Sequence, residues 1–192
     1  LKFSDLEVVK TWDSLGLRGS GINTLIVDKV FVKPDAILRF NKIIEKSQPP
    51  YEDFDQDYLY YNTPFYPGFY VGFAAMAVGG AERVLDEFEK HTAGPVRFSG
   101  INEKDSPASQ PVLSELKLEM LSAKSLLNEY IAMMERDKGG PYEGAKYKAI
   151  RAKIIDKCAQ IGVKSLLTLG GHALLKGHPV ELFTRDLMAI AT

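Results

Sequence analysis

The feature that most constrains the fold of this sequence is a helical spacing of apolar residues that occurs four times after residue 63. In each stretch, apolar residues recur at intervals of three and four, which is the pattern of one buried face on a helix. The four stripes are Phe65, Phe69, Phe73, Met76, Gly80, Val84 and Phe88; Leu113, Leu116, Met120, Ala123, Leu127, Ile131 and Met134; Ile150, Ile154, Cys158, Ile161 and Ser165; and Val180, Phe183, Leu187 and Ile190. The pattern predicts a mainly α fold with a four-helix up-down bundle.

Proline and glycine mark the ends of the predicted helices. Thr63-Pro64 and Ser106-Pro107 are typical of an N-cap followed by proline at the first helical position, and Pro179 predicts the start of the fourth helix. Gly139-Gly140 and Gly170-Gly171 predict the ends of the second and third helices.

The first forty residues favour strands. Residues 24–32 are rich in β-branched side chains, and residues 16–21 before them hold three glycines, which permit a tight or left-handed turn. Because these glycines lead into a strand and not into a helix, a strand-connecting turn is favoured over a phosphate-binding loop.

Two or three strands do not form a stable sheet alone, so we expect the chain to be the C-terminal part of something larger. Residues 1–40 are then the incomplete end of a β-domain, residues 41–62 a linker and residues 63–192 the helical bundle domain. Alone, the chain is expected to associate and to be inactive, because strand edges and phenylalanines would lose their covering domains.

Composition excludes several function classes. The chain has 24 basic and 25 acidic residues, so it lacks the excess of cations that nucleic-acid binding requires. The single cysteine, Cys158, permits neither an intrachain disulfide nor a cysteine metal cluster, and its place on the third stripe predicts a core thiol. The longest uncharged apolar stretch, residues 68–81, is shorter than the roughly 20 residues that span a bilayer, so we expect a cytoplasmic protein without a membrane segment.

The histidines are candidates for proton transfer. His172 follows Gly170-Gly171 at a predicted helix end, where the backbone can approach a ligand and an imidazole can act as a base near neutral pH. A loop histidine that only hydrogen-bonds a carbonyl is the alternative, and the residue pattern alone favours it. His91 and His178, at a helix end and a helix start, are interpreted as structural. No spacing of His, Asp and Glu indicates a metal site.

Two further groups leave structural and functional interpretations open. Arg185-Asp186 lie in the predicted fourth helix, and we interpret them as a salt-bridged or oligomer-facing pair. Residues 58–61 and Tyr66 could line an aromatic pocket, but core packing or domain docking is the favoured interpretation.

Two separated motifs resemble the acyl-CoA dehydrogenase superfamily. Residues 12–21, W-D-S-L-G-L-R-G-S-G, are similar to a turn near the end of the family's middle β-domain, W-x-x-L-G-(M/L)-R-G-(T/S). The extended run after it resembles the family's V-(F/H)-V-P, with Lys33 inserted before the proline. Downstream, Leu169-Gly170-Gly171 and Arg185-Asp186 resemble the family's L-G-G and R-D, in the same order and at about the same spacing.

The resemblance implies a flavin-dependent oxidoreductase that binds FAD, or FMN, and acts on a small molecule, either an acyl-CoA or an aromatic compound. It implies a homodimer or homotetramer with no nucleic-acid or membrane partner. Gly170 and Gly171 would contribute to the flavin site, and Arg97 and Gln110 are the available counterparts of the residues at its adenine end. In the branch of two-component flavin monooxygenases, His172 would deprotonate or orient the substrate.

The residues that distinguish dehydrogenases from monooxygenases in this family do not decide between the two reactions. Ala173 favours a monooxygenase slightly, whereas Met188 stands where those enzymes carry histidine. We expect histidine, and not the Glu-Gly pair of dehydrogenases, within a few residues beyond Thr192. A helical scaffold that has kept the fold and lost the flavin is the alternative function.

Overall fold

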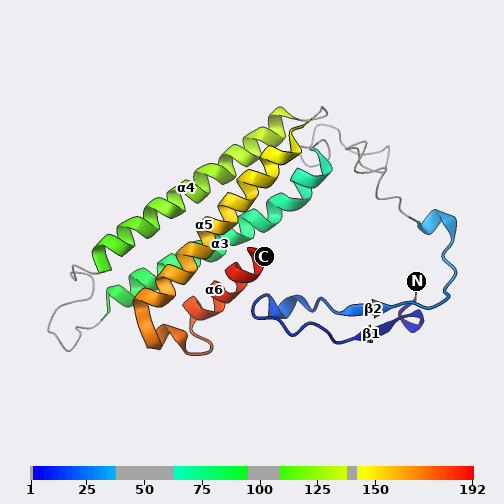
Figure 1. Ribbon diagram of the computed structural model, residues 1–192, viewed down its shortest axis with the longest axis horizontal. Coiled ribbons are helices and arrows are strands. Elements are labelled where there is room, and N and C mark those ends of the chain that lie inside the picture. The colour runs from blue at the N-terminus through cyan, green and yellow to red at the C-terminus, as the bar shows by residue number, and fades with distance from the viewer. Residues whose placement is uncertain (1, 38–62, 95–108, 138–141) are drawn as a thin grey trace.

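A computed structural model describes residues 2–37, 63–94, 109–137 and 142–192, and within these ranges the chain is mainly helical (Figure 1). Two short strands come first, followed by four α-helices, as the sequence predicts. The elements are β1 (Glu7–Val9), β2 (Thr24–Ile26), α3 (Phe65–Thr92), α4 (Ser109–Arg136), α5 (Gly144–Leu169) and α6 (Pro179–Ile190), with 3-10 turns η1 (Phe3–Asp5), η2 (Arg18–Ser20), η3 (Pro34–Ala36) and η5 (Gly170–Leu174). In these ranges no helix is long and apolar enough to cross a bilayer.

The predicted helix boundaries agree with the structure where they fall on described residues. α5 ends at Leu169 before Gly170, and α6 begins at Pro179. α3 starts one residue later than predicted, because Pro64 occupies the N-cap and not the first helical position. The signals at 106–107 and 139–140, like the linker 41–62, lie outside the described residues.

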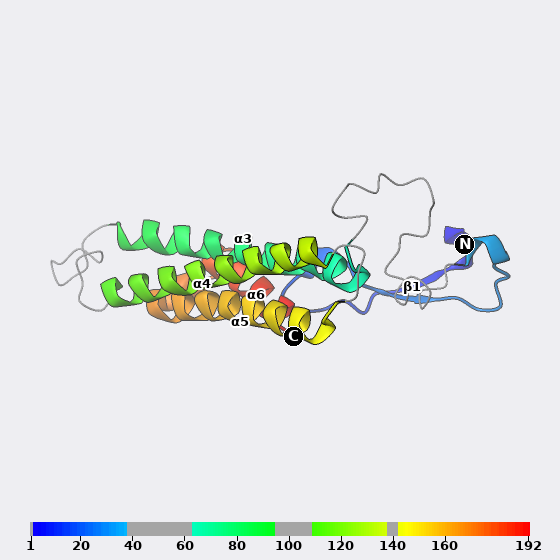
Figure 2. The ribbon, with the colours of Figure 1, turned by 90° about the horizontal axis from the view of Figure 1, so that it is seen from above.

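Three long helices run side by side in alternating directions, and the short α6 packs across α3 and α5 (Figures 1 and 2). The second, third and fourth predicted stripes supply a large part of the buried side chains. Fully or nearly fully buried are Leu116, Met120, Ala123, Met134, Ile154, Cys158, Ile161, Ser165, Val180 and Leu187. Burial raises the pKa of the Cys158 thiol to about 12, so it stays protonated at neutral pH and the predicted core thiol is confirmed.

The first predicted stripe is wrong over the N-terminal half of α3. Phe69, Phe73 and Met76 are 57%, 36% and 55% exposed. The buried face of this half-helix instead consists of Val71, Ala74, Ala77, Val78 and Ala81. Small side chains let α3 approach its neighbours closely, and an added Cβ at Gly80 would lie 3.3 Å from Leu187 on α6. The large aromatic rings therefore form an exposed row, in which Phe65 and Phe69 stack with centroids 6.0 Å apart.

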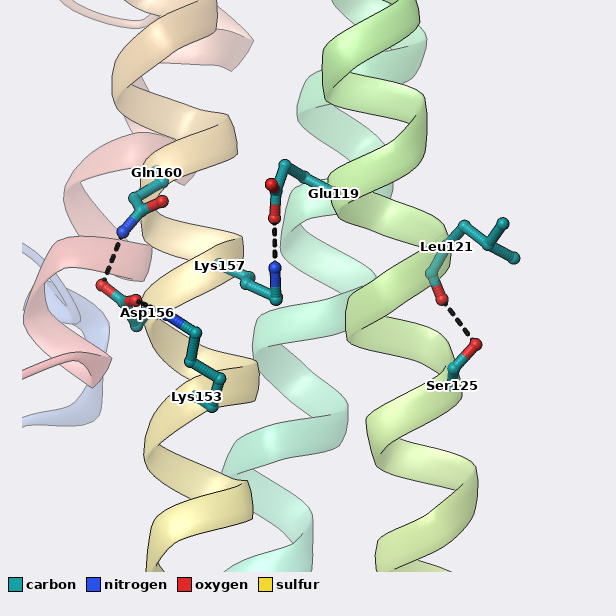
Figure 3. Close-up of polar contacts among 7 residues, drawn as sticks. All are labelled: Glu119, Leu121, Ser125, Lys153, Asp156, Lys157 and Gln160. Atoms are coloured by element: carbon teal, nitrogen blue, oxygen red, sulfur yellow. Dashed lines mark hydrogen bonds and ion pairs between the residues drawn. The ribbon is translucent and has the colours of Figure 1, made fainter.

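Ion pairs follow the antiparallel register of α4 and α5. Lys157 Nζ donates to the Glu119 carboxylate at 2.5 Å (Figure 3), and Lys164 pairs with Glu115 one turn away. Partly exposed pairs of this kind contribute about 0–1 kcal/mol each, so the register depends mainly on the apolar core. The same register places Gln110, in the first turn of α4, level with the C-terminal end of α5.

The N-terminal hairpin projects from the bundle, and most of its residues are exposed (Figure 1). β1 and β2 are antiparallel, with Val8 opposite Leu25. The predicted strand over 24–32 pairs only as far as Ile26, because β1 is three residues long and no other strand of the described chain lies beside β2. Gly16, in the turn between the strands, is the one buried residue in the range 2–37.

Gly16 is buried because the turn docks onto α6. The Leu17 N–H donates to the Asp186 carboxylate at 2.6 Å, and Arg185 Nη1 donates to the Leu15 carbonyl at 2.8 Å. Between these bonds, a Cβ on Gly16 would lie 2.1 Å from the carbonyl oxygen of Arg185. Only glycine lets the turn come this close.

Hydrogen bonds to the Leu17 carbonyl also stabilise the turn from within. The Leu17 carbonyl accepts from the indole of Trp12 at 2.9 Å and from the Ser20 hydroxyl at 2.7 Å. Leu17 has φ of 53°, a left-handed conformation that costs a non-glycine residue about 1 kcal/mol or more. These bonds, with the one to Asp186, hold it there. The predicted strand-connecting turn is confirmed.

The interpretation of Arg185-Asp186 needs a correction. Arg185 does form a salt bridge, since its Nε lies 2.5 Å from the Glu181 carboxylate. Both residues, however, also bind the turn of the same chain, although adjacent helix positions point in different directions. Both side chains reach the turn because their partners, the Leu15 carbonyl and the Leu17 N–H, lie on either side of Gly16.

Replacing Gly16 with alanine is expected to undock the turn. The added methyl must displace the Arg185 carbonyl, at an overpacking cost of about 1–3 kcal/mol, which weakens docking roughly 10- to 100-fold. Trp12, the single tryptophan, reports this directly, because its indole is anchored to the same turn. We expect Trp12 emission to shift to longer wavelength while helical circular dichroism stays unchanged.

The matched control is Gly19→Ala in the same turn, where an added Cβ meets nothing within 4 Å. It should leave the emission unchanged. Equal spectra for the two variants would contradict the docking of Gly16.

Candidate functional site

Four of the five predicted site residues lie at one end of the bundle. At this end α3 and α5 finish and α4 begins, and η5 leads into α6 (Figure 1). Gly170, Gly171 and His172 occupy the start of η5, and Gln110 lies in the first turn of α4 at the same level. Arg97 lies outside the described residues.

The backbone conformation explains the glycine at position 170 but not the glycine at position 171. Gly170 caps α5 with φ of 73°, a backbone conformation that side chains with L chirality rarely adopt. Gly171 has no positive φ, and an added Cβ would meet nothing within 4 Å. No described neighbour therefore requires glycine at 171, and its exposed backbone is open to close approach by another molecule.

All three histidines of the chain meet at this end. The ring centroid of His172 lies 5.9 Å from that of His91, at the end of α3, and 5.6 Å from that of His178. His178 is the N-cap of α6, and its Nδ1 accepts from the Val180 N–H at 3.2 Å. A neutral His178 therefore carries its proton on Nε2. The structural interpretation of His178 is confirmed, whereas His172 is exposed in the turn between the helices.

A paired carboxylate lies near the histidines on α3. Glu87 accepts from Lys90 at 3.0 Å and contacts Arg83 at 2.7 Å. The hydrogen bond from Lys90 lowers the pKa of Glu87, burial opposes this, and Arg83 and, more weakly, His178 favour the charged form. Its negative charge is thus compensated by cations, and in the described ranges no group of His, Cys, Asp and Glu is placed to hold a metal ion.

This end of the bundle suits an anionic ligand better than a metal. It combines an exposed glycine backbone, the start of a long helix with its positive dipole end, the amide of Gln110 and three imidazoles. An imidazole here can also accept or donate a proton near neutral pH. Sequence reasoning did not predict the histidine cluster, because its members come from three elements that only the tertiary fold brings together.

Comparisons with known proteins place the chain in context. A family model described as "Acyl-CoA dehydrogenase, C-terminal domain" matches residues 71–192. The putative acyl-CoA dehydrogenase YdbM of Bacillus subtilis (strain 168) is 23% identical over 185 residues, which are 96% of this chain and 44% of that protein. The flavin-dependent monooxygenase oxygenase subunit HsaA of Rhodococcus jostii (strain RHA1) is 26% identical over 196 residues, covering 96% and 50%.

A solved structure shows the same fold. XiaF from Streptomyces sp., in complex with FADH2 and glycerol, superposes with a TM-score of 0.83 at 14% identity, covering 98% of this chain and 48% of that one. The chain thus spans about half the length of the relatives it matches.

Proposed function

Because this chain belongs to the acyl-CoA dehydrogenase family by its C-terminal domain, we propose that it is the C-terminal half of a flavin-dependent oxidoreductase. Residues 1–40 are then the end of a β-domain, 41–62 a linker and 63–192 the helical bundle domain. The family match over residues 71–192 carries the proposal, and the open backbone at Gly171 leaves room for a ligand at this end of the bundle.

The residues at this end fit the phosphate-bearing part of FAD, or the phosphate of FMN. Phosphate oxygens need N–H donors and positive potential, and the turn at Gly170-Gly171 and the start of α4 offer both. The side-chain amide of Gln110 is a further donor. We assign Arg97 to the adenine end of the same site from the resemblance of residues 97–100 to the family's R-x-x-F-G.

When bound, the flavin supplies two-electron redox chemistry. We propose that the reaction is a monooxygenation of a small aromatic compound, which the similarity to the monooxygenase subunit HsaA supports. His172 would accept the proton of a substrate hydroxyl, since an exposed imidazole can take up a proton near neutral pH. Dehydrogenation of an acyl-CoA is the second candidate, supported by the similarity to YdbM.

We also propose a homodimer or homotetramer in the cytoplasm. Leu118 and Leu121 on α4 and Leu167 on α5 are 66%, 61% and 73% exposed, and they supply apolar surface for contacts between copies.

Flavin binding to the purified full-length protein tests the cofactor. We expect either a visible absorbance band at about 450 nm or, anaerobically, tight binding of reduced flavin. Gly171→Leu should weaken flavin binding roughly 10-fold or more by blocking the backbone, with little change in melting temperature, because an added Cβ at this position meets nothing within 4 Å. Gly79→Leu, on an exposed face of α3 that is equally open, is the control. A protein that binds neither oxidised nor reduced flavin would favour the scaffold function.

Replacement of His172 tests its role in turnover. His172→Ala in the complete enzyme should lower turnover by roughly 10²-fold, the scale of general acid–base catalysis, and leave flavin affinity unchanged. Lys176→Ala, which also removes an exposed basic group from this loop, should keep full turnover. Unaltered turnover in His172→Ala would show that His172 is a structural loop histidine.

A further inference from the structure

A pocket of about 200 Å³ lies at the opposite end of the bundle from His172. It is formed where α3 begins, α4 ends and α5 begins. Five tyrosines of the described chain line it: Tyr66, Tyr70, Tyr130, Tyr142 and Tyr147. Along the axis of α3, roughly 30 Å separates Tyr70 from His91, at 1.5 Å per residue. The pocket is therefore separate from the proposed flavin site.

The aromatic walls are held in place before any ligand arrives. Tyr130 and Tyr147 meet edge to face, with centroids 5.0 Å apart. The Tyr130 hydroxyl donates to the Pro67 carbonyl at 3.0 Å, and the Tyr147 hydroxyl donates to the Asp137 carboxylate at 2.9 Å. Burial raises the pKa of Tyr130 to about 12, although Arg151 opposes this, so that its ring is neutral at physiological pH.

Positive charge is concentrated in the same pocket. Lys148 and Arg151 line it, and no described carboxylate is among its lining residues. The Arg151 guanidinium lies 4.5 Å from the centroid of the Tyr70 ring, and its Nε is buried without a hydrogen-bond partner. A ligand carboxylate in the pocket would therefore meet two cations, with which it can form charge-assisted hydrogen bonds.

The start of α5 adds to this potential. Gly144, the first residue of the helix, lines the pocket, and the N-cap residue Glu143 makes no side-chain capping bond. The positive end of the helix dipole favours an anion at this position. The two cations and the start of α5 thus both favour a negative charge beside the aromatic rings.

We propose that this pocket binds a small aromatic carboxylate, with its ring among the tyrosines and its carboxylate on Arg151 and the N-terminus of α5. The size agrees, because a cavity of about 150 Å³ accommodates benzene and the pocket here is slightly larger. This inference goes beyond the proposed oxidoreductase, since it adds a second ligand site about 30 Å from His172.

Calorimetric titration of the full chain with benzoate tests the site. Benzamide, which has the same ring without the charge, should bind at least roughly 10-fold more weakly, and inorganic phosphate, which has the charge without the ring, more weakly still. Arg151→Gln should weaken benzoate binding about 10- to 100-fold and leave benzamide unchanged, whereas Arg151→Lys should retain a large part of the affinity.

Lys146→Gln is the matched control, because it removes an exposed cation from the same helix end without lining the pocket. It should change benzoate affinity less than about twofold. If Arg151→Gln fails to fold, the proposal is tested by Lys148→Gln and by the comparison of benzoate with benzamide on the unaltered chain. No binding of benzoate at millimolar concentration, equal affinities for the two ring compounds, or an equal loss in Lys146→Gln would each overturn the proposal.

Discussion

The arrangement of this chain depends on the close contact between the Gly16 turn and the Arg185-Asp186 pair. Leu17 and Leu15 present one donor and one acceptor on either side of a glycine, and α6 offers the complementary carboxylate and guanidinium. Because no other residue of the range 2–37 is buried, this contact is what joins the hairpin to the bundle in the described chain. Two motifs about 170 residues apart are therefore halves of one docking surface.

The bundle behind this contact carries different chemistry at its two ends. One end gathers glycine backbone and three histidines, and we propose that it holds a flavin phosphate and a proton-transfer group. The other encloses five tyrosines with Lys148 and Arg151. The long antiparallel helices keep these ends about 30 Å apart, so that a ligand at one end does not touch the other. The apolar core between them gives rigidity and no chemistry of its own.

Much of the fold follows from the sequence, because helix periodicity and the Gly and Pro signals are local. Most positions of three of the four stripes, the end of α5, the start of α6 and the buried Cys158 are predicted correctly, whereas Ile131 of the second stripe is 37% exposed. The error on α3 has a physical cause: an alanine-rich face packs closely while Phe69 and Phe73 stay outside, and periodicity favours the larger side chains. The histidine cluster, the tyrosine pocket and the docking role of Asp186 depend on contacts between distant segments, which no local pattern reveals.

Hydrogen exchange at the Leu17 amide tests the docking contact most directly. This N–H donates to Asp186 at 2.6 Å, whereas residues 18–22 after it are exposed. We predict that Leu17 exchanges at least about 10-fold more slowly than the neighbouring Arg18 amide, and that Asp186→Ala removes this difference while the helices keep their protection. Equal exchange at Leu17 and Arg18 in the unaltered protein, or protection of Leu17 that survives Asp186→Ala, would contradict the account.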